Sequence, residues 1–204
     1  MPATIKQTIL SALMMTAVVS ANNMPSLQQD QDWSPNGVNV TLMRYYVTAV
    51  RGSLQGFQQG ILNNKTFSLN PQCLDETFIG SFIKIEDAVS AFDIGRLFGS
   101  MGDIYQIGYN LDKSCNFNEL FYMLGQYCYK TNCNFDDIQK NLLSNLFTLT
   151  GSINNIADLM FSNGKTQDLT DLSTCFTTFN GVGSDVGKIF RAILKFDPTK
   201  VSIL

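Results

Sequence analysis

Three glycines stand four residues apart in the stretch RGSLQGFQQG, at Gly52, Gly56 and Gly60. A glycine in a helix interior costs roughly 1 kcal/mol relative to alanine, so a helix that contains three needs an offsetting interaction. Close approach of a second backbone supplies such an interaction. The spacing therefore predicts a helix that packs through its glycines.

The residues around these glycines also repeat at helical spacing. Apolar side chains recur every three or four residues, which gathers them on one side of a helix. They are Met43, Val47, Val50, Leu54, Phe57 and Ile61. Small residues, including the three glycines, occupy the adjoining face of the helix, and Arg and Gln side chains occupy its third face. We predict a helix with apolar, small and polar faces, central to the fold.

Two other interpretations of the glycine stretch conflict with its residues. A phosphate-binding loop needs a G-x-G-x-x-G pattern, or a Lys followed by Ser or Thr, after a strand, and none of these is present. A membrane dimerisation face would expose Arg51 and three glutamines to lipid, which is energetically costly.

The combination of glycines and apolar residues recurs twice. Gly95, Gly99 and Gly102 accompany an apolar arc of Ile94, Leu97, Phe98, Met101, Ile104 and Tyr105. Gly183 and Gly187 accompany an arc of Val186, Ile189, Phe190, Ile193 and Leu194. Further helical spacing covers 116–131 and 134–161, helix-start signals stand at 74–77 and 134–137, and 162–175 resembles a loop. We predict an all-α fold, a compact disulfide-stabilised bundle of five or six helices with glycine-lined helix packing.

The N-terminus has the pattern of a secretory signal peptide. Lys6 precedes the apolar run ILSALMMTAVVS, and small residues at 19–21 precede two asparagines. An apolar run of about a dozen residues is short against the roughly 20 of a spanning helix. We predict a signal peptide over 1–21, an extended segment over 22–38 and a single helical domain over 39–204. The protein is then secreted or retained in the lumen of the secretory pathway, without a transmembrane anchor.

Five cysteines follow the predicted signal peptide: Cys73, Cys115, Cys128, Cys133 and Cys175. In an oxidising compartment they should pair, and an odd number leaves one free or bonded to another chain. Helices that alternate up and down would pair Cys73 with Cys133 and Cys115 with Cys175. Cys128 is then left over, or takes the place of Cys133.

The chain contains no histidine, which excludes Ser-His-Asp and Cys-His catalysis. Without histidine or a second close cysteine pair, no zinc site is expected. The remaining acidic pairs are interpreted as residues of helix starts, and none follows the pattern of a calcium loop. They are Asp75 and Glu76, Glu86 and Asp87, Asp136 and Asp137, and Asp168 and Asp171. We therefore predict no catalytic residue, no cofactor, no metal and no enzymatic activity.

Two sequons, NVT at Asn39 and NKT at Asn64, are glycosylation candidates in a secreted protein. Asn64 is the better candidate because it falls in an expected loop. Nucleic acid is not an expected partner, since the net charge is -3 and the Lys and Arg residues form no stripe.

Three motifs resemble those of a group of secreted, cysteine-containing, all-helical proteins of ciliate-like protists. They are the RGxxxGfxxG helix at 51–60, the CL pair at Cys73 and Leu74, and the DvGKifR stretch from Asp185 to Arg191. The group has no assigned activity, so the resemblance implies only a helical, secreted protein.

Two functions fit these observations. The first is a secreted non-enzymatic structural or interaction protein, a subunit of an extracellular or secretory-granule assembly, whose partners are further copies or other secreted proteins. The alternative is a carrier of lipid or another small apolar ligand in a cavity of the helical bundle.

Overall fold

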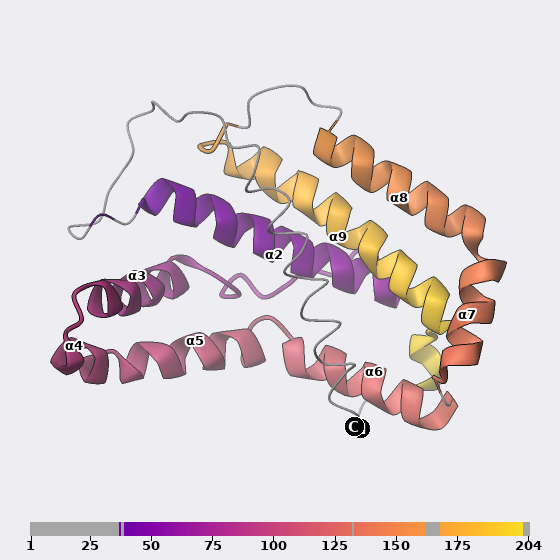
Figure 1. Cartoon of the computed structure of the whole chain (residues 1–204), viewed down its shortest axis with the longest axis horizontal. Coiled ribbons are helices and arrows are strands. Elements are labelled where there is room, and N and C mark those ends of the chain that lie inside the picture. Colours follow the sequence, from indigo (N-terminus) through magenta and orange to yellow (C-terminus); the bar gives the residue numbers. More distant parts are fainter. Residues whose placement is uncertain (1–36, 38, 132, 162–167, 202–204) are drawn as a thin grey trace. The chain divides into compact units, whose positions relative to one another are not determined.

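The computed structural model describes residues 37, 39–131, 133–161 and 168–201. These residues form eight α-helices and a short 3-10 helix, with no β-strand among them (Figure 1). The predicted all-α fold is confirmed. The predicted signal peptide, and the 22–38 segment except Gly37, lie outside the described residues. The helices are α2 Val40–Leu62, α3 Glu76–Ser90, α4 Ile94–Gly99, α5 Met101–Lys113, α6 Phe117–Thr131, α7 Phe135–Ser144, α8 Leu146–Phe161 and α9 Leu172–Leu194, with η1 at Pro198–Lys200.

The two longest helices, α2 and α9, lie side by side and run in the same direction (Figure 1). Gly52 lies against Asn180, and Gly60, two turns further on, lies against Lys188. The contacts therefore advance equally along both helices. A parallel pair requires a long connection, and α3 to α8 provide it.

Glycines line the contact between α2 and α9. A Cβ atom at Gly52 would lie 2.7 Å from the carbonyl oxygen of Phe176, and one at Gly56 would overlap the carbonyl oxygen of Asn180. Gly183 and Gly187 of α9 meet the backbone of α2 in the same way. The structure thus shows the glycine-lined packing that the spacing predicts, here between two backbones.

The glycine-lined packing does not extend to α4 and α5. No described atom lies within 4 Å of a Cβ placed at Gly99 or Gly102, and a Cβ at Gly95 meets only the side chain of Asp93. All three glycines are exposed. The prediction that they pack against another helix is wrong for the described part of the chain, because no helix in it carries a matching row of small residues against them.

The remaining helices complete the bundle around α2 and α9. The helix α8 runs antiparallel to α9, since Asn145 before α8 lies against Ala192 near the end of α9, and Leu159 near the end of α8 lies against Gly181 in the first half of α9. The helix α3 packs on α5 through a hydrogen bond from Ser81 to Asp103. The described residues all belong to one compact unit.

The polar face of α2 is also partly buried. The side chain of Gln58 is only 2% exposed, and its amide donates to the carbonyl oxygen of Cys115 over 2.9 Å. Gln59 donates to the carbonyl oxygen of Phe67, and Gln55 accepts from the backbone of Leu69. All three faces of α2 therefore contact other elements, which makes it the central helix.

Local polar residues set the helix boundaries. Asp75 and Asn134 cap α3 and α7 with their side chains, as the start signals predict. The stretch 134–161 is broken at Asn145, whose side chain donates to the carbonyl of Asn141 and competes with the backbone pattern. Asp171 caps α9, so the helix begins inside the stretch 162–175 that the sequence indicated as a loop.

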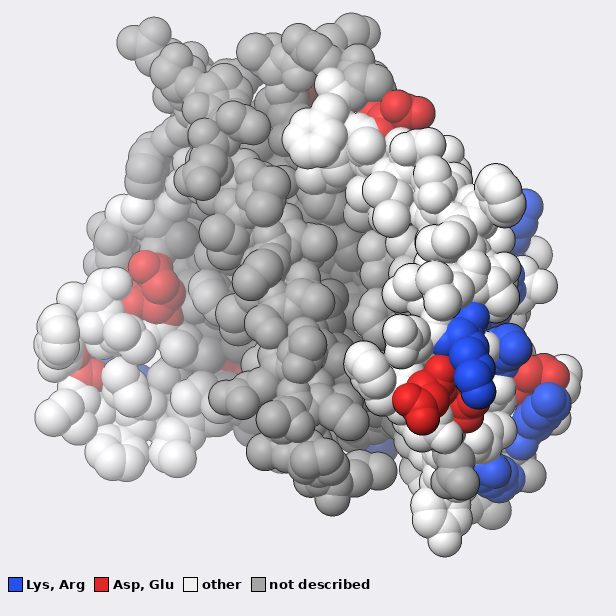
Figure 2. All heavy atoms as spheres, turned by 45° about the vertical axis from the view of Figure 1, so that its right-hand side comes forward, with Lys and Arg blue, Asp and Glu red and all other residues white. Residues whose placement is uncertain are grey.

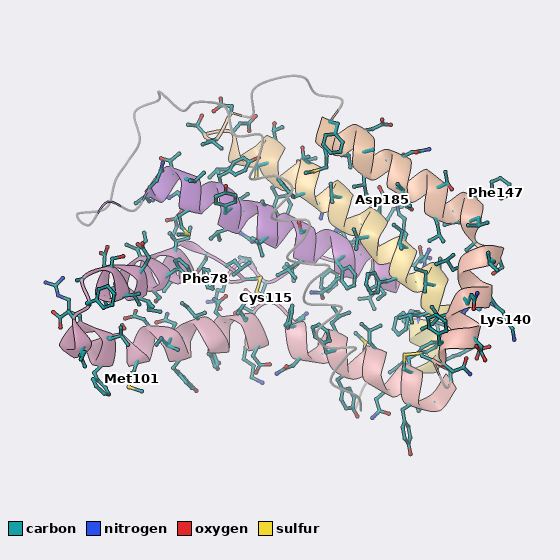
Figure 3. The ribbon with its side chains drawn as sticks, in the orientation of Figure 1. Phe78, Met101, Cys115, Lys140, Phe147 and Asp185 are labelled. Atoms are coloured by element: carbon teal, nitrogen blue, oxygen red, sulfur yellow. A yellow bond between two sulfur atoms is a disulfide. The ribbon has the colours of Figure 1, made fainter. Side chains whose placement is uncertain are left out.

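The disulfides join Cys73 to Cys115 and Cys128 to Cys133. The predicted bridges Cys73–Cys133 and Cys115–Cys175 are wrong, and the unpaired cysteine is Cys175, not Cys128. The pairing follows from the hairpin of α3 to α5. This hairpin returns the chain to its starting point and brings the residues before α3 next to those after α5. Figure 3 shows Cys115 at this junction.

Candidate functional site

The helices α4 and α5 carry a row of apolar side chains that face away from the other described helices. Phe92 is 92% exposed, Ile94 72% and Tyr105 73%. Figure 3 shows Met101 pointing outward from the ribbon. We call this row the α4–α5 apolar face; it consists of Phe92, Ile94, Leu97, Phe98, Met101, Ile104 and Tyr105.

Its orientation is set by a polar contact on the opposite side of α5. Asp103 accepts a hydrogen bond from the buried Ser81 hydroxyl over 2.9 Å, and Lys84 lies 3.3 Å from the same carboxylate. Both partners belong to α3. The helix α5 therefore turns Asp103 inward and its apolar residues outward, and none of its residues is buried. The apolar arc at 94–105 is therefore exposed and is not part of the core of the predicted compact bundle.

The cations near the α4–α5 apolar face are paired with carboxylates. Arg96 lies 3.2 Å from Asp93, one turn earlier, and Lys84 lies beside Asp103. Exposed ion pairs of this kind add little to stability, with a median of about 0–1 kcal/mol. No uncompensated cation of the described residues therefore lies at this face. Hydrophobic burial is therefore the main interaction that this surface offers.

A second set of exposed apolar residues lies on α7 and α8. Phe147 is 96% exposed, and Figure 3 shows its ring pointing away from the helix. Phe135, Leu143, Ile153 and Phe161 are exposed as well. Two separate helix pairs thus present apolar side chains that the described residues do not cover.

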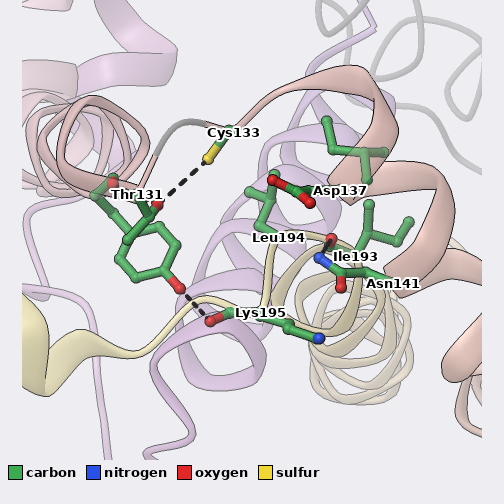
Figure 4. Close-up of a pocket in the computed structure, with 9 residues that line it drawn as sticks. Thr131, Cys133, Asp137, Asn141, Ile193, Leu194 and Lys195 are labelled. Carbon is green, nitrogen blue, oxygen red and sulfur yellow. Dashed lines mark hydrogen bonds between the residues drawn. The ribbon is translucent and has the colours of Figure 1, made fainter.

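A hollow of about 170 Å³ lies between the end of α6, α7 and the end of α9 (Figure 4). Its polar groups already bond one another. The Tyr127 hydroxyl donates to the carbonyl oxygen of Lys195, and Asn141 donates to that of Ile193 over 3.0 Å. Burial raises the pKa of Tyr127, and the charge of Asp197 adds to this effect. These contacts hold the end of α9 in place, which is a structural role.

The acidic pairs are not brought together. Asp75 and Asp171 cap helices, and Asp136 and Asp137 lie in the first turn of α7, as expected for helix starts. Hydrogen bonds from Thr174 lower the pKa of Asp171. Glu86 and Asp87 differ, since they lie in the second half of α3. Within the described ranges, no three His, Cys, Asp or Glu residues gather closely enough to hold a metal ion.

The unpaired Cys175 is buried in the first turn of α9. Its thiol donates to the carbonyl oxygen of Tyr45 over 3.5 Å, and burial raises its pKa to about 11. A thiol of this kind is unreactive, because the thiolate is the nucleophile. The odd cysteine of the sequence is therefore not positioned to join two chains.

The two sequons differ in their surroundings. The Asn39 side chain caps α2 by accepting from the backbone of Leu42. Asn64 is exposed after the end of α2, and its oxygen accepts from the backbone and hydroxyl of Thr66. Asn64 remains the better candidate, and glycosylation at either position stays a prediction.

None of the described helices has the length and apolar character that a bilayer crossing requires. Comparisons with protein families, with curated proteins and with solved structures found no match. The resemblance to secreted proteins of ciliate-like protists therefore stays a prediction.

Proposed function

We propose that this protein is a secreted, non-enzymatic interaction protein that assembles with further copies of itself through the α4–α5 apolar face. Such a protein would serve as a subunit of an extracellular or secretory-granule assembly. The observation that supports this proposal is the orientation of α5, whose charged Asp103 faces the neighbouring helix while its apolar residues face outward.

The energetics favour association. Full burial of a Val, Leu, Ile, Phe or Met side chain contributes roughly 1.5–3 kcal/mol. Phe98, Met101 and Ile104 are each at least half exposed, and they neighbour one another on successive turns. Contiguous apolar surface of this kind marks interaction sites on soluble proteins. A partner surface that covered these side chains would gain several such contributions.

The assembly is non-covalent in this proposal. Both disulfides are formed within the chain, and the remaining thiol of Cys175 is buried. The carrier alternative requires an enclosed apolar cavity. The hollows that the described residues form at the end of α9 are open and partly lined by charged and amide side chains. Assembly is therefore the proposal we favour.

The test compares the oligomeric state of the secreted protein with that of two double variants. Phe98→Ser with Ile104→Ser removes an aromatic and an aliphatic side chain from the α4–α5 apolar face. Phe147→Ser with Ile153→Ser makes the same two changes on α8, where both side chains are also exposed. Native mass spectrometry and light scattering at micromolar concentration give the mass of each.

We expect an oligomer for the unsubstituted protein and for the α8 variant, and a monomer for the α4–α5 variant. A monomer for the unsubstituted protein would contradict the assembly. An oligomer that only the α8 variant disrupts would place the contact on α8 instead. A co-purifying lipid mass on a monomer would favour the carrier.

A further inference from the structure

A basic hollow of about 390 Å³ lies between the end of α9 and the beginning of α8. Three cationic side chains line it, Lys188, Arg191 and Lys195. Lys188 and Arg191 are three residues apart and lie on one side of α9, and Lys195 follows directly after the last residue of this helix. Asn145 and Thr148 line the hollow opposite them, and the described residues of the lining include no carboxylate. In the face drawn in Figure 2, Lys and Arg gather at the lower right with Asp and Glu beside them, on the side where Figure 1 shows α7 and the end of α9.

Two of the three cations have no acidic partner in the described part of the chain. Lys188 is neutralised by the buried Asp185, whose carboxylate lies 2.7 Å from its amine. Neither Arg191 nor Lys195 lies within ion-pair distance of a described carboxylate. Asp137 shares only the smaller, neighbouring hollow with Lys195. The basic hollow therefore has an excess of positive charge.

Cations at the end of a helix commonly serve to complement its free carbonyl groups. The end of α9 already has other donors for these groups. The carbonyl of Ile193 accepts from the amide of Asn141, and that of Arg191 accepts from the backbone of Phe196. The carbonyl of Ala192 accepts from the backbone of Lys195. Capping of α9 therefore does not account for the uncompensated cations.

The beginning of α8 adds to the positive potential. The first backbone N–H groups of a helix have no acceptor one turn earlier, and the helix dipole gives this end partial positive charge. Thr148 belongs to the first turn of α8, which has 16 residues, and it is one of the residues that line the hollow. Cationic side chains and a helix beginning thus lie at the same hollow.

We propose that the basic hollow binds the oxyanion of a phosphate or sulfate ester. Arg191 forms paired hydrogen bonds to two of its oxygens, as the planar guanidinium does with phosphate. Lys195 supplies a second charge, and Thr148 a hydroxyl. The hollow has room for more than the oxyanion alone, since a water molecule occupies about 30 Å³ in the liquid. The ester would thus enter with part of the sugar or glycerol unit that carries it.

The test measures thermal unfolding of the full chain with inorganic phosphate, with sulfate and with chloride at equal ionic strength. Arg191→Gln with Lys195→Asn removes the two uncompensated cations, and asparagine suits the left-handed backbone at position 195. Arg96→Gln with Lys113→Asn removes the same charges from the exposed surfaces of α4 and α5. NMR titration of the unsubstituted protein with phosphate gives a second measurement that needs no variant.

We expect phosphate and sulfate, but not chloride, to raise the Tm of the unsubstituted protein. The rise is roughly 3–6 °C when the anion is tenfold above its dissociation constant. The Arg96 and Lys113 variant keeps the rise and the Arg191 and Lys195 variant loses it. In the titration, the amide signals at 146–148 and of Arg191 should shift.

An equal rise with chloride, or an equal loss in both variants, would show general charge screening and overturn the proposal. Absence of both a Tm rise and amide shifts at 50-fold excess of phosphate over protein would overturn it as well. The same measurements then distinguish a soluble ester from a lipid headgroup. The soluble ligands are a sugar phosphate and a sugar sulfate, and the lipid ligands are vesicles with and without phosphatidylglycerol. The change in Tm is compared with and without anion for each variant at one protein concentration, and the oligomeric state is measured separately, so failure of either proposal is recognised on its own.

Discussion

At the residue scale, Gly56 has the tightest contact between the backbones of α2 and α9. The contacting atoms are the carbonyl of Asn180 and the amide of Ser184, which are backbone groups that no rotamer change can move. We therefore expect Gly56→Ala to destabilise the protein by about 1–3 kcal/mol, although alanine favours helices by roughly 1 kcal/mol.

Gly125 of α6 is the matched control, because no described atom lies within 4 Å of a Cβ placed there. Gly125→Ala should raise stability by about 0.4–1 kcal/mol. Urea unfolding followed by circular dichroism measures the free energy of unfolding of both variants. If Gly56→Ala were as stable as Gly125→Ala, the close contact between α2 and α9 would be absent.

Cys175 provides a second test at this scale. The native protein should show no thiol that reacts with Ellman's reagent at pH 8, and one per chain after unfolding in urea. Burial raises the pKa of this thiol from 9.0 to about 11. The corresponding stability is present below pH 9 and is lost as the pH rises toward about 11, because the unfolded chain then releases its proton first.

The control for the pH effect is Cys175→Ala, which should lose less stability than the unsubstituted protein between pH 8 and pH 11. Tyr45 beside it also titrates at raised pKa because of burial, so part of the loss should remain in the variant. Rapid modification of the native thiol at pH 8 would contradict the buried position.

At the element scale, the two disulfides close loops of very different length. Cys73 and Cys115 are separated by 42 residues and connect the beginning of α3 to the end of α5, whereas Cys128 and Cys133 are separated by 5. The chain-entropy relation gives about 4 kcal/mol for the longer loop and about 2 kcal/mol for the shorter one. We therefore expect that replacing both cysteines of the Cys73–Cys115 bridge by alanine lowers the free energy of unfolding more than the same replacement at the Cys128–Cys133 bridge.

The measurement is urea unfolding of the two double variants under identical conditions. The Cys73 and Cys115 variant should lose more stability than loop length alone predicts. Both side chains are fully buried, so their removal also leaves a cavity. A larger loss for the Cys128 and Cys133 variant would show that the end of α6 contributes more to the fold than the junction of α3 and α5.

At the scale of the whole molecule, the helices differ in burial: α2 and α9 form a buried pair, whereas α4 and α5 are exposed. The helix α2 has eight buried residues and α9 has four, whereas α4 and α5 have none. Amide exchange follows local stability, which depends on such buried contacts. At low protein concentration, amides of α5 should exchange by local opening well before those of α2 and α9.

Hydrogen exchange with mass spectrometry at several protein concentrations measures this difference. If the α4–α5 apolar face is covered on association, protection of α5 should rise with concentration while that of α2 stays constant. Strong and concentration-independent protection of α5 would contradict both its exposure and its proposed role in assembly.

Much of the local structure follows from the sequence alone. Asp75 and Asn134 begin helices because their side chains satisfy backbone groups only three residues away. The glycines of α2 share one face because helical periodicity places every fourth residue together. These effects depend on neighbours in the chain, so they can be recognised without the fold.

Only the tertiary structure decided what lies against each face. Gly52, Gly56 and Gly60 meet α9 because it carries Gly183 and Gly187 at matching positions, while Gly95, Gly99 and Gly102 have no such partner among the described helices. Cysteine pairing depended on the return of the chain through α3 to α5. The periodicity of α5 identified its apolar side, but the bond from Ser81 to Asp103, 22 residues apart, turned that side outward. A sequence pattern groups residues on a face, whereas long-range contacts determine whether the face is covered.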